Sequence, residues 1–139
     1  MGRRLGLGDE AMLQEVCRRY KERVPSDEEA SRLLACDDVY VWVAEDGGEL
    51  AGFAYAYVLL RVDGDTGVFL YELEVDERFR RRGHGRALVE EARRLAERIG
   101  ALKMWVQTDE ENVAAQRTYA AAGGQRLPEP DLLFAWRFR

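Results

Sequence analysis

An arginine-rich stretch stands out in the sequence: RFRRRGHGRAL, residues 78–88, has five arginines and two glycines in eleven positions. It lies between a β-branched and aromatic run, VFLYELEV, and a segment with helical spacing of apolar residues. The first N–H groups of a helix have no internal partner, and the helix dipole favours an anion there. Arginine side chains add charge-assisted hydrogen bonds to phosphate oxygens. The stretch is therefore predicted to bind phosphate.

Other readings of this stretch fit less well. A Walker A loop ends in Gly-Lys-Ser or Gly-Lys-Thr, which GHGRAL lacks, and a dinucleotide fingerprint needs a third glycine where Leu88 stands. A solvated charged face and a nucleic-acid patch are the alternatives. The run is short and belongs to a chain of net charge −5, so we expect no nucleic acid as a partner.

Two carboxylates precede the loop on the strand that leads into it. Because side chains alternate along a strand, Glu72 and Glu74 are predicted to share one face, opposite Leu73 and Val75. They could form a plain exposed polar face. They could equally bind a cationic substrate and accept a proton from it. A second acidic cluster, with Asp109 at its start, follows the next predicted strand.

The segment NVAAQRTYAAAGG places Asn112 and Tyr119 seven residues apart, which is about two helical turns, so both share one helix face. Asn112 is typical of a helix cap. A tyrosine among alanines more often packs into a core, with its hydroxyl hydrogen-bonded.

The elements that must position these residues follow from periodicity and turn signals. Helices are predicted over 9–23, 26–36, 85–99 and 112–122, and a hairpin turn at Gly47–Gly48. Strands are predicted over 39–46, 49–62, 68–75, 101–108 and 132–138. This order predicts one α/β domain over residues 1–139, with a mixed, mostly antiparallel central sheet flanked by helices.

The pattern Arg80-x-x-Gly83-x-Gly85, after LEV and before an amphipathic helix, closely resembles the pyrophosphate loop of the GCN5-related N-acetyltransferases (GNAT). The later NVAAQRTYAAAGG segment and the order of elements from Val39 to Phe138 are also similar to that superfamily. The resemblance implies the GNAT fold, acetyl-CoA as cosubstrate, and direct attack by an amine without a metal.

The same resemblance implies roles for individual residues. Backbone groups of Leu73 and Val75 would hold the pantetheine arm, and Tyr119 would protonate the departing thiolate. Asn112 would also contact the cofactor, and the His84 side chain would lie beside the loop. The pyrophosphate would be held by N–H groups of the loop and by arginine side chains, from Arg80, Arg81, Arg82, Gly83, His84, Gly85 and Arg86.

A narrower resemblance is carried by AYAYVLLR, by YELEV before RRRGHG, and by VQTD. These stretches are similar to the gentamicin-type aminoglycoside 3-N-acetyltransferases. The resemblance implies a small cationic amine as substrate, and that group carries an acidic residue in the place of Glu72. By position, Glu72 on the strand that leads into the loop is the first choice of general base and Asp109, at the end of the adjacent strand, is the second, with Glu74 beside Glu72 in the substrate site. A polyamine, a protein amine and a non-catalytic acyl-CoA sensor are the alternatives.

Location and assembly follow from weaker signals. No apolar run approaches the roughly 20 residues that cross a bilayer, and the start of the chain lacks the apolar core of a secretory signal. We therefore expect a cytoplasmic protein without a membrane partner, and a homodimer is possible. Cys17 and Cys36 have no metal-ligand spacing, so no metal is expected.

Overall fold

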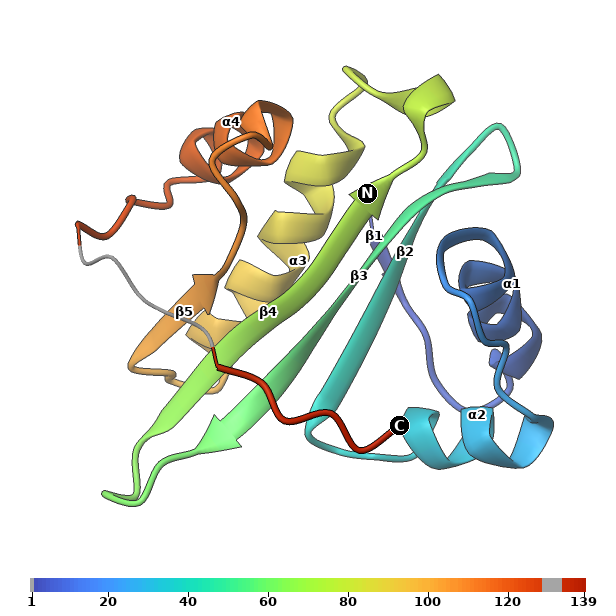
Figure 1. The fold of residues 1–139 in the computed structure, drawn as a ribbon, viewed down its shortest axis with the longest axis horizontal. Helices are drawn as coiled ribbons and strands as arrows, with labels where there is room; N and C mark the ends of the chain where they lie inside the picture. Colours follow the sequence, from blue (N-terminus) through green and yellow to red (C-terminus); the bar gives the residue numbers. More distant parts are fainter. Residues whose placement is uncertain (1, 129–133) are drawn as a thin grey trace.

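A five-stranded sheet forms the centre of the computed structural model, which describes residues 2–128 and 134–139 (Figure 1). The strands follow one another across the sheet in chain order. The first four are antiparallel, and only the last pair is parallel. The strands are β1 (Gly2–Arg4), β2 (Val39–Asp46), β3 (Glu49–Leu60), β4 (Thr66–Val75) and β5 (Lys103–Val106). The predicted mixed, mostly antiparallel sheet is confirmed.

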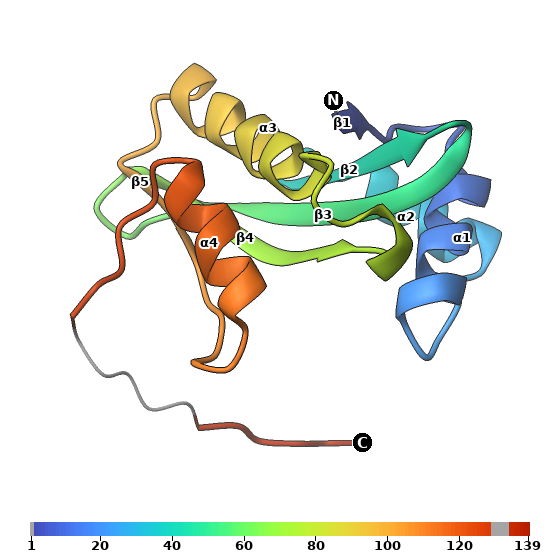
Figure 2. The same cartoon turned by 90° about the horizontal axis from the view of Figure 1, so that it is seen from above.

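Helices cover both faces of this sheet (Figure 2). One face carries α1 (Glu10–Tyr20) and α2 (Asp27–Leu34), and the other carries α3 (His84–Arg98) with α4 (Val113–Ala121) beside it. A short 3-10 turn, η1 (Glu77–Phe79), follows β4. Within the described residues, no helix combines the length and apolarity that crossing a bilayer requires.

Strand alternation gives the sheet an apolar core on each side. On β2, Trp42 and Ala44 pack toward α3, whereas Val41 and Val43 pack toward α1 and α2. The α3 helix presents a stripe of Leu88, Ala92 and Leu95, all less than 2% exposed, to its side of the sheet. The start of α3 is thereby fixed against the middle of the sheet, which positions the loop before it.

Strand β4 changes partners along its length. Its parallel ladder with β5 runs from Gly67, opposite Lys103, to Leu70, opposite Val106. Its antiparallel ladder with β3 continues further, to Val75 opposite Gly52, with a register shift that leaves Tyr71 as an extra residue. In the part of the chain that the structure describes, the outer edge of β4 from Tyr71 to Val75 therefore has no strand beside it.

One predicted element is wrong in its described part. Residues 134–138 of the predicted strand form no strand, and its first two residues, 132–133, lie outside the described residues. Phe134, Trp136 and Phe138 alternate as a strand would, but they are 74%, 77% and 92% exposed. Alternation alone does not make a strand, because a strand also needs a neighbour to take its backbone hydrogen bonds. The sequence also missed β1, which is too short for periodicity to detect.

Candidate active site

The loop between β4 and α3 turns through unusual backbone conformations. Arg81 has a φ of 63°, and Gly83, the N-cap of α3, has a φ of 86°. Residues other than glycine rarely adopt this left-handed backbone conformation. The positive φ at Arg81 is therefore backbone strain of the kind found at ligand sites. Left-handed residues in such turns direct successive N–H groups to one side, which makes an anion-binding concavity.

The donors of this concavity have no protein acceptor. The first hydrogen bond at the start of α3 joins the N–H of Ala87 to the carbonyl of Gly83, at 3.0 Å. No acceptor among residues 2–128 and 134–139 pairs with the six N–H groups that precede it, those of Arg81, Arg82, Gly83, His84, Gly85 and Arg86. Unpaired N–H groups at a helix start are the elements of a phosphate site.

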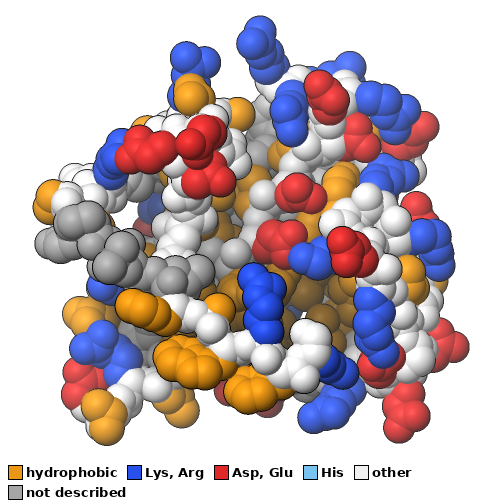
Figure 3. Space-filling model, in the orientation of Figure 1, with side chains coloured by type: hydrophobic (Ala, Val, Ile, Leu, Met, Phe, Trp, Pro, Cys, Tyr) orange, Lys and Arg blue, Asp and Glu red, His pale blue; other side chains and the backbone are white. Residues whose placement is uncertain are grey.

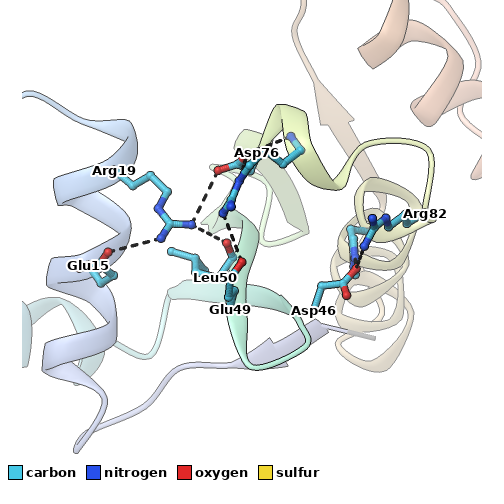
Figure 4. Close-up of polar contacts among 9 residues, drawn as sticks. Glu15, Arg19, Asp46, Glu49, Leu50, Asp76 and Arg82 are labelled. Carbon is cyan, nitrogen blue, oxygen red and sulfur yellow. Dashed lines mark hydrogen bonds and ion pairs between the residues drawn. The ribbon is translucent and has the colours of Figure 1, made fainter.

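The side chains of the loop divide into two groups. Asp46, at the end of β2, accepts a hydrogen bond from Arg82 at 3.1 Å and lies 2.8 Å from His84 Nε2 (Figure 4). These two side chains tie the loop to the β2–β3 hairpin. Arg81 and Arg86, by contrast, are exposed and have no ion-pair partner within the described ranges. They are the two arginines of the loop that an anion can recruit without breaking a contact.

Asp46 is a supporting residue that the sequence did not reveal. It belongs to a tight hairpin in which Gly47 and Gly48 have φ values of 59° and 84°, the backbone of a type I′ turn. Only the tertiary fold brings this hairpin against residues 82–84. The one sequence signal that pointed to Asp46 is its position just before the Gly47–Gly48 turn.

A second set of contacts holds the beginning of the loop (Figure 4). Arg19 of α1 donates a hydrogen bond to the carbonyl of Leu50 at 2.6 Å and lies 3.7 Å from Asp76. Asp76 accepts the N–H of Arg78 at 3.0 Å, and Arg78 also pairs with Glu49 at 3.3 Å. Arg80 makes only a long contact, 3.5 Å, with the carbonyl of Val75.

Gly85 allows α4 to approach the start of α3. A Cβ at this position would lie 3.3 Å from Thr118 Cγ2 and 3.6 Å from Val75 Cγ2. The next residue, Tyr119, is half-buried and packs on the same core as Leu73 and Val75. Burial raises the pKa of Tyr119 above its ordinary value, so its hydroxyl keeps its proton at neutral pH.

The turn before α4 uses two of the predicted polar residues. Asn112 Oδ1 accepts the N–H of Ala115 at 3.1 Å, so the predicted cap is confirmed. The N–H of Asn112 donates in turn to Asp109 Oδ1 at 3.1 Å. The Asp109 carboxylate therefore organises this turn, which weakens its claim to be a proton acceptor.

Glu72 and Glu74 project from β4 on the face that carries α1. Glu72 lies opposite Tyr55, and Glu74 lies opposite Phe53, whose ring belongs to the core beneath α1. Figure 3 shows acidic side chains around a basic one on this side of the molecule, above a hollow with a hydrophobic floor. The predicted shared face is confirmed.

The two carboxylates differ in their surroundings. Glu72 Oε1 lies 2.8 Å from Lys21 Nζ, at the end of α1. In the described residues, no cation lies within ion-pair distance of Glu74. Partial desolvation of the Glu74 carboxyl raises its pKa, and the negative charge of Glu72 raises it further. Burial, and next the charge of Glu72, also raise the pKa of Tyr55. Glu72 thus already holds an ammonium group, supplied by the protein.

The arrangement places an anion site and an ammonium site at the same strand. The anion loop, which we define as residues 76–86, starts where β4 ends. The outer edge of β4 is open from Tyr71 onward, and Glu72 lies next to the bulge. A phosphate-bearing ligand with an extended arm could pair along that edge and bring its far end close to a bound amine. Among the described residues, no group of three or more His, Cys, Asp or Glu side chains could hold a metal ion.

Solved structures share this fold closely. An aminoglycoside acetyltransferase from an uncultured soil metagenome, in complex with sisomicin, has a TM-score of 0.88 and 22% identity, covering 100% of this chain and 96% of that one. A second structure of that enzyme, in complex with trehalose, has a TM-score of 0.87. AAC(6')-Iy in complex with a CoA-based bisubstrate analogue has a TM-score of 0.81 and 22% identity, with 99% and 97% of the two chains covered.

A third neighbour has a different kind of acceptor in its name. The ribosomal-protein-alanine N-acetyltransferase of Brucella melitensis biovar Abortus 2308 has a TM-score of 0.76 and 20% identity, covering 98% of this chain and 99% of that one. No curated protein matches the sequence. The profile of the family described as "Acetyltransferase (GNAT) family" matches residues 3–123. Because that match spans most of the chain, the protein belongs to the GNAT family and is an acetyltransferase.

Proposed function

We propose that this acetyltransferase moves the acetyl group of acetyl-CoA to a primary amine of an aminoglycoside or a closely similar aminosugar. The observation that carries the proposal is the Lys21 ammonium on the Glu72 carboxylate, at 2.8 Å, beside the open edge of β4. A carboxylate that holds one ammonium can hold another. Neighbours of this fold solved with sisomicin, with trehalose and with an aminoglycoside-derived bisubstrate analogue support a carbohydrate acceptor.

The loop and strand edge fit acetyl-CoA. The unpaired N–H groups of residues 81–86 would accept the pyrophosphate oxygens, with the exposed side chains of Arg81 and Arg86 adding charge. Backbone groups of Leu73 and Val75, on the open edge of β4, would pair with the amides of the pantetheine arm as a strand would. Acetyl-CoA supplies a thioester that is already activated toward amines.

Proton transfer away from the amine falls to the carboxylates. A primary ammonium of the lysine type has a pKa of about 10.4, so it must lose a proton before it can attack. We assign Glu72 the binding of the ammonium and the acceptance of its proton, because it lies at the bulge and already contacts a cation. Glu74 adds negative potential next to Glu72. We assign Asp109 a structural role, because its carboxylate accepts the N–H of Asn112 in the turn before α4.

Proton transfer to the leaving group falls to Tyr119. Its raised pKa keeps the hydroxyl protonated, and it packs on the same core as Leu73 and Val75, the residues assigned here to the pantetheine arm. A backbone N–H on the open edge of β4 would stabilise the negative charge that develops on the acetyl oxygen.

The acceptor class is tested by measuring free-thiol release from acetyl-CoA with gentamicin, sisomicin, spermidine and a lysine-containing peptide. We expect the highest kcat/KM with the aminoglycosides. NMR of the product identifies the acetylated nitrogen, since AAC(6')-Iy is a 6′-N enzyme by name whereas the short sequence resemblance favours the 3-N position. Activity confined to the peptide or to spermidine would overturn the aminosugar assignment.

Gly83→Ala should raise the KM for acetyl-CoA at least fivefold. The left-handed backbone at Gly83 costs an alanine about 1–2 kcal/mol, and relaxing it would turn the N–H groups away from the pyrophosphate. The matched control is Gly64→Ala in the β3–β4 turn, where φ is 88° and a Cβ also meets nothing within 4 Å. Equal KM values for the two variants would show that the loop does not bind the cofactor.

Glu72→Gln should lower kcat/KM for the aminoglycoside by about 10²-fold, since a positioned base contributes at least that much. The KM for acetyl-CoA should stay unchanged. Glu90→Gln on α3 is the control, because that glutamate side chain is equally exposed, at 23%, and is also ion-paired. If activity survives at Glu72→Gln but falls at Glu74→Gln, the base is Glu74.

Tyr119→Phe should lower kcat by about 10²-fold with little change in either KM, because only the proton donor is removed. Tyr20→Phe is the control: its hydroxyl is buried without a hydrogen-bond partner in the described residues, on the other face of the sheet. A Tyr119→Phe enzyme with wild-type kcat would assign the protonation of the thiolate to water.

A further inference from the structure

A row of aromatic rings extends from the carboxylates along the same face of the sheet. We call it the aromatic row and define it as Tyr55 and Tyr57 of β3, Phe69 and Tyr71 of β4, and Trp105 of β5. Tyr71 is its centre, with ring centroids 5.1 Å from Tyr55, 5.5 Å from Tyr57 and 5.6 Å from Phe69. Phe69 stacks on Trp105 at 5.4 Å with an angle of 10° between the rings.

The row lies at the surface, next to the core beneath α1, on which Tyr55 packs. Tyr71 is 52% exposed, and the other four rings are half-buried. The helices α1 and α2 cover the neighbouring part of this face, over Val41, Val43 and Phe53. The hollow in Figure 3 lies on this side of the sheet and has a hydrophobic floor. A contiguous, partly exposed apolar patch of this kind often marks a ligand-binding site.

Glycine and a bulge bring the rings of the row together, and these rings meet mostly edge to face: Tyr71 lies at 89° to Tyr57 and at 77° to Phe69. A Cβ at Gly67 would lie 2.7 Å from Trp105 Cζ3, so only glycine lets that indole lie against β4 and stack on Phe69. The bulge adds the extra residue Tyr71 to the same face as Glu72. Glu72 is three positions beyond Phe69, so the distance from Phe69 to the carboxylate is about 10 Å along β4. The three adjacent strands make the row about 10 Å wide.

The protein's own lysines show which ligand groups the two ends accept. At one end Lys21 Nζ contacts Glu72 at 2.8 Å. At the other end Lys103 Nζ lies 5.5 Å from the centre of the Trp105 ring, within the range of a cation–π contact. Both ends of the row therefore accept ammonium groups, and the tilted rings between them offer apolar surface with tyrosine hydroxyls at their edges.

We propose that the aromatic row is the sugar-binding platform of the acceptor site, in which a hexopyranose ring of an aminosugar packs against the exposed ring of Tyr71 while one ammonium replaces Lys21 on Glu72. Rigid, linked sugar rings that carry ammonium groups about 10 Å apart fit this surface, whereas a flexible polyamine offers no rigid ring to pack against Tyr71. The inference rests on the proposed function and names the part of the acceptor that determines specificity.

The test compares Tyr71→Leu, Tyr71→Phe and a matched control, Tyr40→Leu, whose ring lies on the α3 side of the sheet against Trp42. Each protein, saturated with CoA, is titrated with trehalose by calorimetry, since trehalose has sugar rings but no amine. Steady-state kinetics are then measured with sisomicin and with the ring-free 1,3-diaminopropane.

We expect Tyr71→Leu to weaken trehalose binding at least fivefold and to raise the KM for sisomicin about tenfold, equivalent to about 1.4 kcal/mol. Its loss in kcat/KM with sisomicin should exceed that with diaminopropane at least fivefold. Tyr71→Phe keeps a ring and should retain wild-type affinities, as should Tyr40→Leu.

Equal losses with sisomicin and diaminopropane, or unchanged trehalose binding in Tyr71→Leu, would overturn the platform. Failure of the wild-type enzyme to bind trehalose would overturn it as well. These outcomes are separate from the proposed reaction: an enzyme that acetylates no aminoglycoside but binds trehalose through Tyr71 refutes the reaction and leaves the platform standing.

Discussion

The loss of the β5 partner from β4 after Leu70 is the constraint on which the rest of the site depends. Beyond Leu70, β4 is paired on one side alone, and its ladder with β3 keeps it extended. Its other edge has free backbone groups with which a ligand could pair. The bulge at Tyr71 marks the point where the ladder with β5 stops, and it sets Glu72 on the face opposite Leu73. One local irregularity thus gives β4 an open edge and a face that carries the two carboxylates.

The anion loop depends on packing elsewhere in the molecule. Its N–H groups can stay unpaired because Ala87 and Leu88 are fixed into α3, and because Asp46 holds Arg82 and His84 from the neighbouring hairpin. The left-handed backbone at Arg81 persists for the same reason. The site is therefore largely preorganised, so binding of an anion requires little further ordering.

Opposite charges are kept apart by the sheet. Guanidinium groups and helix N–H donors gather beyond the end of β4, whereas Glu72 and Glu74 stand on the face below α1. Lys21 pairs with Glu72, which avoids a pair of uncompensated, partly desolvated carboxylates. The same face carries the aromatic row, so charge and aromatic surface meet at Tyr71.

The sequence by itself determined what depends on neighbours along the chain. The loop with its two glycines, the Asn112 cap, the Gly47–Gly48 turn and the shared face of Glu72 and Glu74 all follow from local backbone geometry and alternation. Contacts between distant segments were decided only by the tertiary structure. These are the contact of Asp46 with His84, the ion pair of Lys21 with Glu72, and the gathering of rings from three strands in one row. Alternation at Phe134, Trp136 and Phe138 predicted a strand that the described residues do not form. The physical reason is the same throughout, since a periodic pattern fixes which side chains share a face but not which other segment will meet that face.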